Sequence, residues 1–371
     1  MKPTIVTIVG TRPEIIRLSR VISKLDESVN HILVHTGQNY DPKLNEIFFS
    51  ELNVRTPDYF LNADASSLGS VMGDILKKIE DVFVNHRPDG VVILGDTNSA
   101  IAAVMAKRMH IPVYHMEAGN RSFDENVPEE TNRRMVDHIA DFNLAYSELA
   151  RQNLLAEGLK PRHVMDTGSP MAEVLTYYSE QIESSQVLKT LDLKPKQYVL
   201  VSAHRQENVD SESRLRTLIQ TLEDIHQKWD LPVLVSTHPR TRDRLSKLTV
   251  ARDSRGVIWH EPFNYSDYVT LQKNAFCTIS DSGTISEEAS ILGFPAVTIR
   301  DSMERPEALE TGAVIMAGID SSNVIRAIEV AVGFPSRSIP AEYKVTDFSR
   351  RVLGIVQSTY WAHKSWLGLK S

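Results

Sequence analysis

The sequence lacks the features that mark several large classes of protein. It has one cysteine, Cys277, so no disulfide can form within the chain, and neither an oxidising compartment nor a cysteine-based metal cluster is indicated. No apolar run approaches the roughly 18 residues needed to cross a membrane. The N-terminal MKPTIVTIVG is short and runs directly into motif residues, which is not the pattern of a cleavable signal.

Metal and nicotinamide signatures are also missing. None of the 12 histidines belongs to an H-E-x-x-H or a Cys/His pattern, so we expect no catalytic metal. A G-x-G-x-x-G fingerprint is absent, so a nicotinamide cofactor is not indicated, and we expect no cofactor at all.

The overall composition is that of an ordinary globular protein. Apolar residues make up 42% and charged residues 24% of 371 residues, which at about 150 residues a domain suggests two domains. The net charge of −7 does not favour binding to nucleic acid, although a local basic pocket remains possible. We therefore expect a two-domain cytoplasmic protein that binds neither nucleic acid nor membranes.

β-rich segments alternate with helical ones along the whole chain. In the first half they are residues 4–10, 31–37, 90–96, 111–119 and 142–146, and in the second half 198–204, 231–238, 256–262, 276–281 and 294–300. This alternation predicts α/β domains with parallel sheets. The polar stretch at 176–195 is the best candidate for a linker, with a boundary between 168 and 195.

Polar clusters follow many of these strands, at the sheet edge where open α/β domains bind ligands. Arg12 stands beside a helix start and could contact a phosphate, or it could be an exposed arginine next to a turn. Asp96 could cap the next helix or take part in acid–base chemistry. Glu117 ends an apolar strand, where a carboxylate needs a partner. Glu129 and Glu130 could be catalytic or could simply begin a helix.

The second half repeats this pattern. His204 and Arg205 suit proton transfer or diphosphate binding, although a lone histidine is usually structural. His238 follows the next strand. The run from Asp281 to Glu288 is typical of a turn that holds a phosphate, with a helix-borne carboxylate for ribose hydroxyls. A nucleotide-type ligand in a cleft between the domains is the natural hypothesis.

Seven runs, in order, carry a family resemblance: GTRPE, HTGQNYD, GDTNS, HMEAGNR, VPEETNRR, DSGTISEEA and MERPEAL. From about Gly10 to Gly312 the chain resembles the non-hydrolysing UDP-N-acetylglucosamine 2-epimerases. The runs HTGQNYD, MEAGNRSFDENVPEE, TGSPM, SAHRQENVD and STHPRT are similar to the UDP-N-acetyl-L-fucosamine synthase branch. That branch epimerises C2 of UDP-2-acetamido-2,6-dideoxy-L-talose for capsule and O-antigen, a lipopolysaccharide component.

The resemblance implies a glycosyltransferase-B-like fold of two Rossmann-like domains. We expect an N-terminal domain at 1–170, a nucleotide-binding domain at 171–350, and a C-terminal helix at 351–371 that packs back on the first domain. Family members are usually cytoplasmic homodimers.

The resemblance also implies a reaction without a cofactor: UDP is eliminated to leave a 2-acetamidoglycal and is then added back. The implied catalytic residues are Asp96, Glu117, Glu129 and His204. The implied UDP- or substrate-binding residues are Arg12, Arg17, Arg205, His238, Tyr268, Ser282, Gly283, Thr284, Glu288 and Arg305. The placement of Tyr268 beside the uracil rests on a poor local motif.

Two positions depart from the family pattern. Arg17 stands where many relatives have lysine and is interpreted as an electrostatic clamp, because arginine is a poor acid–base group. Thr284 replaces the second glycine of the usual turn. The altered HTGQNYD and AHRQEN loops leave open whether a second nucleotide sugar acts as an activator, as in the UDP-N-acetylglucosamine branch.

Three other functions compete with an L-fucosamine synthase. They are a UDP-GlcNAc/UDP-ManNAc 2-epimerase, a glycosyltransferase on the same fold, and a non-enzymatic nucleotide-sugar sensor. A sensor has no need of Asp96, Glu117 and Glu129 together, so their joint presence argues against it.

Overall fold

The computed structural model describes residues 2–37, 49–248, 256–334 and 338–369, except for the side chains of residues 206 and 240. The chain divides into two compact units, one made of residues 1–177 and 344–371 and the other of residues 178–343. Each unit contains one parallel β-sheet, so the predicted pair of parallel-sheet α/β domains is confirmed.

The first unit is built on a seven-stranded sheet in the order β3-β2-β1-β4-β5-β6-β7. Its strands are β1 (Thr4–Val9), β2 (Asn30–His35), β3 (Tyr59–Phe60), β4 (Gly90–Leu94), β5 (Val113–Ala118), β6 (Phe142–Ala145) and β7 (Val164–Asp166). Its helices are α1 (Arg12–Ser28), α3 (Leu68–His86), α4 (Ala102–Arg108), α5 (Pro128–Ile139), α6 (Glu148–Ala156), α7 (Met171–Tyr177), α17 (Phe348–Thr359) and α18 (His363–Trp366).

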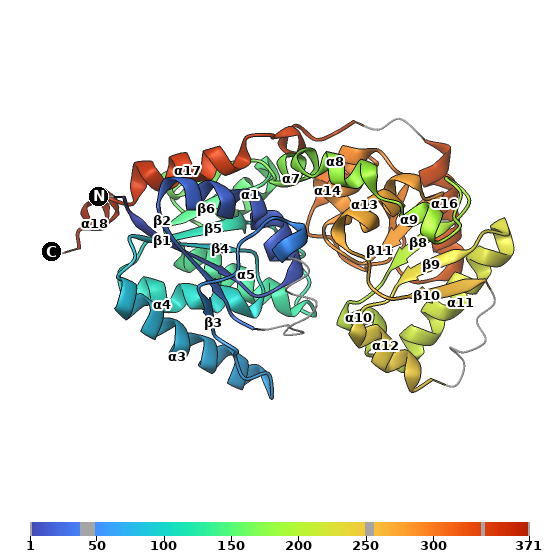
Figure 1. The fold of residues 1–371 in the computed structure, drawn as a ribbon, viewed down its shortest axis with the longest axis horizontal. Coiled ribbons are helices and arrows are strands. Elements are labelled where there is room, and N and C mark those ends of the chain that lie inside the picture. The colour runs from blue at the N-terminus through green and yellow to red at the C-terminus, as the bar shows by residue number, and fades with distance from the viewer. Residues whose placement is uncertain (1, 38–48, 249–255, 335–337, 370–371) are drawn as a thin grey trace. The chain divides into compact units, whose positions relative to one another are not determined.

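Helices cover both faces of this sheet (Figure 1). Val6 and Ile93, from β1 and β4, belong to one buried cluster together with Ile75 of α3 and Ala103 of α4. On the opposite face lies α1, whose residues Ile15, Leu18, Ile22 and Leu25 recur at helical spacing and are buried. The blue helix α1 and the red helix α17 lie side by side (Figure 1).

The C-terminal segment is tied to the first unit by polar contacts. The hydroxyl groups of Tyr114 and Thr359 lie 2.8 Å apart, and Ser349 donates to the Glu173 carboxylate. Nε2 of His363 lies 3.0 Å from the carboxylate of Asp141.

The second unit has a six-stranded sheet in the order β10-β9-β8-β11-β12-β13. Its strands are β8 (Val199–Ser202), β9 (Val233–Ser236), β10 (Val257–His260), β11 (Cys277–Ser280), β12 (Ala296–Thr298) and β13 (Ile315–Met316). Its helices are α8 (Ser179–Ser184), α9 (Val187–Thr190), α10 (Gln206–Val209), α11 (Glu212–Trp229), α12 (Pro239–Ser246), α13 (Tyr265–Asn274), α14 (Ile285–Leu292), α15 (Pro306–Glu310) and α16 (Ser321–Gly333).

In both sheets the chain starts at a central strand and adds the next two strands toward one edge. It then returns to the centre and adds the remaining strands toward the other edge, which is the Rossmann order. The two units divide between residues 177 and 178, inside the range 168–195 expected for the boundary. The polar stretch at 176–195 that was expected as a linker contains α8 and α9, which pack against α13 of the second unit. Its Val187 and Leu191 join an apolar cluster there, which explains why the segment is ordered. None of the helices in the described parts of the chain is both long and apolar enough to span a membrane.

Candidate active site

In the first unit, two predicted carboxylates meet at the carboxyl ends of β4 and β5. The buried guanidinium of Arg133, on α5, donates to the carboxylates of both Asp96 and Glu117. Arg17, on α1, forms a second buried ion pair with the carboxylate of Glu117. Removing one member of a buried ion pair usually costs about 3–5 kcal/mol, so these four side chains depend on one another. Arg17 was expected to act on the substrate, and the structure joins it to Glu117.

The backbone at Glu117 is unusual for a strand residue. Its φ is +63°, in the left-handed region that non-glycine residues rarely adopt. The pairing of β5 with β6 shifts register between Met116 and Ala118, so Glu117 is the extra residue of a β-bulge. Bulges and strained residues concentrate at functional sites because they redirect a side chain. The bulge makes Glu117 the most distinctive residue of this site.

Glu14 is a further buried carboxyl group that sequence reasoning missed. It accepts hydrogen bonds from the backbone N–H of Gly10 (2.6 Å), the backbone N–H of Thr11 (2.9 Å) and the hydroxyl of Thr97 (2.5 Å). It thereby connects the loop after β1 with the loop that carries Asp96. Burial raises the pKa of Glu14 to about 7, against the lowering effect of these hydrogen bonds. The T-x-x-E spacing of a capping box, Thr11 to Glu14, is the signal that could have identified it.

The two glutamates at the start of α5 have different environments. Glu130 is buried and accepts hydrogen bonds from the backbone N–H and the hydroxyl of Ser122, and it pairs with Arg134. Glu129 is half-buried, and within the described parts of the chain its carboxylate makes no hydrogen bond or ion pair. Glu130 therefore fits the alternative in which the residue only helps to begin the helix. Glu129 is available to a ligand.

Only part of the motif HTGQNYD can be placed. His35 is the last residue of β2 and Gly37 follows that strand, and burial lowers the pKa of His35 to about 4. Residues 38–41 lie outside the described residues. Arg12 is the first residue of α1, and its side chain is half-buried.

In the second unit, His204 and Arg205 are held by one buried carboxylate, that of Asp281 after β11. It accepts hydrogen bonds from the backbone N–H groups of His204 and Arg205 and from the side chain of Asn208, all at 3.0–3.1 Å. Nδ1 of His204 also lies 3.3 Å from Oδ1 of Asp281. The exposed His238 lies beside this group, with its ring 5.8 Å from that of His204. The structure thus brings together the two histidines and Arg205.

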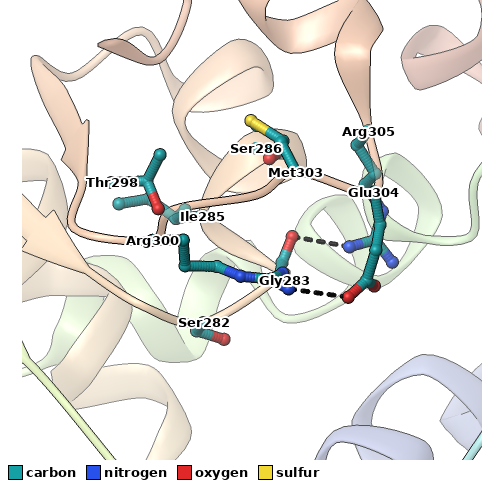
Figure 2. Close-up of a pocket in the computed structure, with 9 residues that line it drawn as sticks. All are labelled: Ser282, Gly283, Ile285, Ser286, Thr298, Arg300, Met303, Glu304 and Arg305. Carbon is teal, nitrogen blue, oxygen red and sulfur yellow. Dashed lines mark hydrogen bonds and ion pairs between the residues drawn. The ribbon is translucent and has the colours of Figure 1, made fainter. Parts of the chain in front are cut away.

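The predicted phosphate turn follows Asp281 directly. The guanidinium of the buried Arg305 donates to the carbonyl oxygen of Gly283 at 2.7 Å, and the hydroxyl groups of Ser282 and Thr284 lie 3.0 Å apart. Figure 2 shows this turn beside Arg300, whose guanidinium bonds to Glu304 at 2.9 Å. A small open pocket lies at this turn, and the residues that line it include Ser282, Gly283, Arg300, Glu304 and Arg305.

Arg305 carries the positive charge of this pocket. Burial alone would lower its pKa, but the neighbouring Glu287, Tyr343, Glu304 and Glu307 raise it, so Arg305 stays a cation. A guanidinium at a hydroxyl-lined turn suits a phosphate or diphosphate group.

Two predicted residues lie away from the pocket lining. Glu288, on α14, is buried and accepts a hydrogen bond from the side-chain amide of Gln272 at 2.7 Å. Tyr268, on α13, is partly buried and packs against an apolar cluster that includes Phe263 and Leu271. Within the described parts of the chain, no group of three or more His, Cys, Asp or Glu side chains could hold a metal ion.

The fold and the site together are those of an α/β enzyme with two Rossmann-ordered units. One unit presents paired carboxylates, and the other presents a turn bound by an arginine. The sequence model of a family described as UDP-N-acetylglucosamine 2-epimerase matches residues 23–357, and the chain belongs to that family.

Known relatives are similar to this chain over almost their full length. The solved structure of a UDP-N-acetylglucosamine 2-epimerase from Rickettsia bellii has a TM-score of 0.92 at 41% identity, covering 99% of this chain and all of that one. The Methanocaldococcus jannaschii UDP-GlcNAc 2-epimerase, solved in complex with UDP-GlcNAc and UDP, has a TM-score of 0.91 at 34% identity, with 96% and 99% covered. A UDP-2,3-diacetamido-2,3-dideoxy-D-glucuronate 2-epimerase from Pseudomonas aeruginosa is 33% identical, with 89% and 92% covered.

The chain is therefore an isomerase, a nucleotide-sugar 2-epimerase. A glycosyltransferase of kitacinnamycin, only 12% identical, has a TM-score of 0.52, which places the fold in the glycosyltransferase-B class.

Proposed function

We propose that the chain converts UDP-2-acetamido-2,6-dideoxy-L-talose to UDP-N-acetyl-L-fucosamine. In the first half-reaction a carboxylate removes the C2 proton while the bond from C1 to the diphosphate oxygen breaks. The electron pair of the C2–H bond forms the C1=C2 double bond of a 2-acetamidoglycal, and UDP leaves with the pair of the broken bond. UDP then attacks C1 again while an acid protonates C2 from the opposite face.

The observation that carries this proposal is the pair of carboxylates, Asp96 and Glu117, held by the single guanidinium of Arg133. Epimerisation at C2 needs an acid–base group for each face of the sugar ring. Fixed guanidinium groups keep such carboxylates in place and counter their charge. Glu129, whose carboxylate makes no hydrogen bond or ion pair within the described parts of the chain, is the third candidate for proton transfer.

UDP leaves with three negative charges, because the broken C1–O bond adds one to the two of the diphosphate ester, and it needs positive charge and N–H donors. The turn at Ser282–Thr284 with Arg305 offers both, and Arg205 and His204 stand next to Asp281, which precedes that turn. We assign diphosphate binding to these residues and ribose binding to Glu288. His204, which is half-exposed and oriented by Asp281, is our candidate for assisting the departure of UDP.

The substrate assignment rests on the motifs HTGQNYD, SAHRQENVD and STHPRT, which resemble the L-fucosamine branch. A second candidate is interconversion of UDP-GlcNAc and UDP-ManNAc, favoured by the epimerases from Rickettsia bellii and Methanocaldococcus jannaschii. In either case we propose that the enzyme is a cytoplasmic homodimer. Its product would serve the synthesis of a surface polysaccharide.

One kinetic comparison decides between the two candidates. The purified protein is incubated in D₂O with each UDP-sugar separately, and the C2 proton is followed by ¹H NMR together with product formation. The proposal expects deuterium at C2 and a higher kcat/KM for the L-talo sugar. A higher kcat/KM for UDP-GlcNAc would establish the second candidate, and no exchange with either sugar would contradict both.

A further inference from the structure

Asp137, on α5, is a buried carboxylate that no motif in the sequence marks. Its oxygens accept a hydrogen bond from the guanidinium of Arg121 at 2.7 Å and from the backbone N–H of Gly119 at 3.2 and 3.3 Å. Nδ1 of His115 lies 2.9 Å from its Oδ1. The side chains of Asp137, His115 and Arg121 are all completely buried.

These three partners stand on both sides of Glu117 in the chain. His115 precedes it by two residues, and Gly119 and Arg121 follow it by two and four. Glu117 has a φ of +63° and lies where the register of β5 against β6 shifts, between Met116 and Ala118. A strained residue persists only where its surroundings over-determine it. Asp137 supplies such a restraint by holding the chain before and after the bulge.

His115 extends the same restraint to the neighbouring strand. Its Nε2 lies 2.7 Å from the carbonyl oxygen of Gly95, the residue before Asp96. Because a carbonyl oxygen only accepts, this nitrogen must carry the proton and donate. The backbone N–H of Gly95 in turn donates to the carbonyl oxygen of Met116 at 3.0 Å. One buried network therefore fixes the segments that carry both Asp96 and Glu117.

The charge of Asp137 suits this role. Burial opposes its ionisation, but the hydrogen bond from His115 and the charges of His115, Arg121 and Arg133 outweigh burial and lower the pKa of Asp137. The carboxylate accepts hydrogen bonds from the guanidinium of Arg121 and the backbone N–H of Gly119 in a solvent-free site, where charge-assisted bonds are strong.

We propose that Asp137 is a positioning residue for C2 epimerisation, acting through His115 and the Glu117 bulge to hold Glu117 and Asp96 in their working geometry. This inference rests on the proposed function, since it takes Glu117 as a group that moves the C2 proton. Asp137 is assigned no acid–base task of its own, because its role is to hold the groups around Glu117 and Asp96.

Asp141 provides a matched control two residues after α5 ends. It is also a buried carboxylate, and it accepts from the backbone N–H of Val113 at 3.0 Å and pairs with Lys107 and His363. Val113 begins β5, whereas Glu117 lies near its other end. Asp141→Asn should therefore lower stability without displacing the catalytic carboxylates.

The test compares Asp137→Asn, Asp141→Asn, Glu117→Gln and the double variant of Asp137 and Glu117, each assayed for C2 deuterium exchange, KM, UDP affinity and Tm. We expect Asp137→Asn to lower kcat about 100-fold, as a displacement of about 1 Å can do, with UDP affinity within about threefold of wild type. We expect Asp141→Asn to lower Tm but to keep kcat within about threefold. In the Glu117→Gln background, the Asp137 substitution should lower kcat by far less than about 100-fold, because only the part of its effect that acts through Asp96 remains.

The double variant distinguishes positioning from general stability. If Asp137 acts only on stability, its effect on kcat will match that of Asp141→Asn or will multiply with that of Glu117→Gln, and either result overturns the inference. Should Asp137→Asn fail to fold, His115→Asn replaces it, since it removes the donor to Gly95 and should lower kcat at unchanged UDP affinity. Wild-type protein without C2 exchange would contradict the proposed function, whereas exchange at the wild-type rate in Asp137→Asn would contradict this inference alone.

Discussion

Arg133 binds Glu117 twice, once through the backbone and once through the side chain. Its Nη1 donates to the carbonyl oxygen of Glu117 at 2.6 Å, and its Nη2 donates to Oε1 of the same residue at 3.1 Å. The second nitrogen also reaches the carboxylate of Asp96. A single planar guanidinium thus sets the position of the bulged residue and the separation of the two carboxylates, which a lysine could not do with one ammonium group.

Glu117→Gln should abolish turnover while leaving UDP binding intact. The amide keeps the size of the side chain and can still accept from Arg133, but it cannot take the C2 proton. General acid–base groups typically contribute about 10²–10⁴-fold, so kcat should fall by that factor. Calorimetry with UDP supplies the control, and a large loss of UDP affinity or of folding would assign Glu117 a structural role.

Arg133→Met should destabilise the protein strongly. The substitution leaves two carboxylates short of a partner in a buried site, which costs about 3–5 kcal/mol in the free energy of unfolding. The adjacent Arg134 is 43% exposed and pairs with Glu130, so Arg134→Met should cost less than about 1 kcal/mol. Urea denaturation of both variants measures the difference. Equal losses in the free energy of unfolding would show that the buried ion pairs contribute no more to stability than the exposed pair.

Glu14 should make stability depend on pH between about 4.5 and 7. Its pKa is about 7 in the folded protein against 4.5 in a model compound, so the folded state binds the proton more tightly. The stabilising contribution is complete below pH 4.5 and is lost as the pH rises through 7, by on the order of 3 kcal/mol.

The check is the difference in unfolding free energy between wild type and Glu14→Gln at several pH values. Relative to the variant, wild type should lose stability as the pH increases from 5 to 8. Glu80→Gln, on the exposed face of α3, is the control and should follow the wild-type curve. A constant difference between wild type and Glu14→Gln across this range would show that Glu14 titrates normally.

Gly283→Ala should weaken UDP binding. A Cβ at this position would lie 2.7 Å from Nη1 of the buried Arg305, so the guanidinium must move from the turn. Loss of one charge-assisted contact costs about 1.5–3 kcal/mol, so the Kd for UDP should rise at least about tenfold. Gly354→Ala on α17, where a Cβ meets nothing within 4 Å, is the control and should leave the Kd unchanged. Unaltered UDP affinity in Gly283→Ala would separate this turn from diphosphate binding.

Much of the fold could be predicted because the longer strands are apolar and alternate with helical segments. The predicted strand at 90–96 corresponds to β4 (Gly90–Leu94), and that at 276–281 to β11 (Cys277–Ser280). The sheet-edge strands β3, β7 and β13 were not predicted, because two or three residues are too few to show a periodic pattern.

The site was predictable only in part, because sequence spacing does not show which distant residues meet. The motifs mark Asp96, Glu117 and Arg305, and each lies in a charged cluster. Arg133 falls within the motif VPEETNRR, but its bridge between two strands exists only once α5 packs on the sheet. Asp137 has no motif at all, and the bulge at Glu117 depends on the register of β5 and β6.

The most direct test of the elimination mechanism is positional isotope exchange in the UDP-sugar. The substrate carries ¹⁸O between C1 and the β-phosphorus, and the position of the label is followed by ³¹P NMR during the approach to equilibrium. If UDP leaves and returns, the label will scramble into the non-bridging β-phosphate oxygens at least as fast as the C2 epimer forms. Epimerisation with the label retained in the bridge would contradict the account, because the C1–O bond would then never have broken.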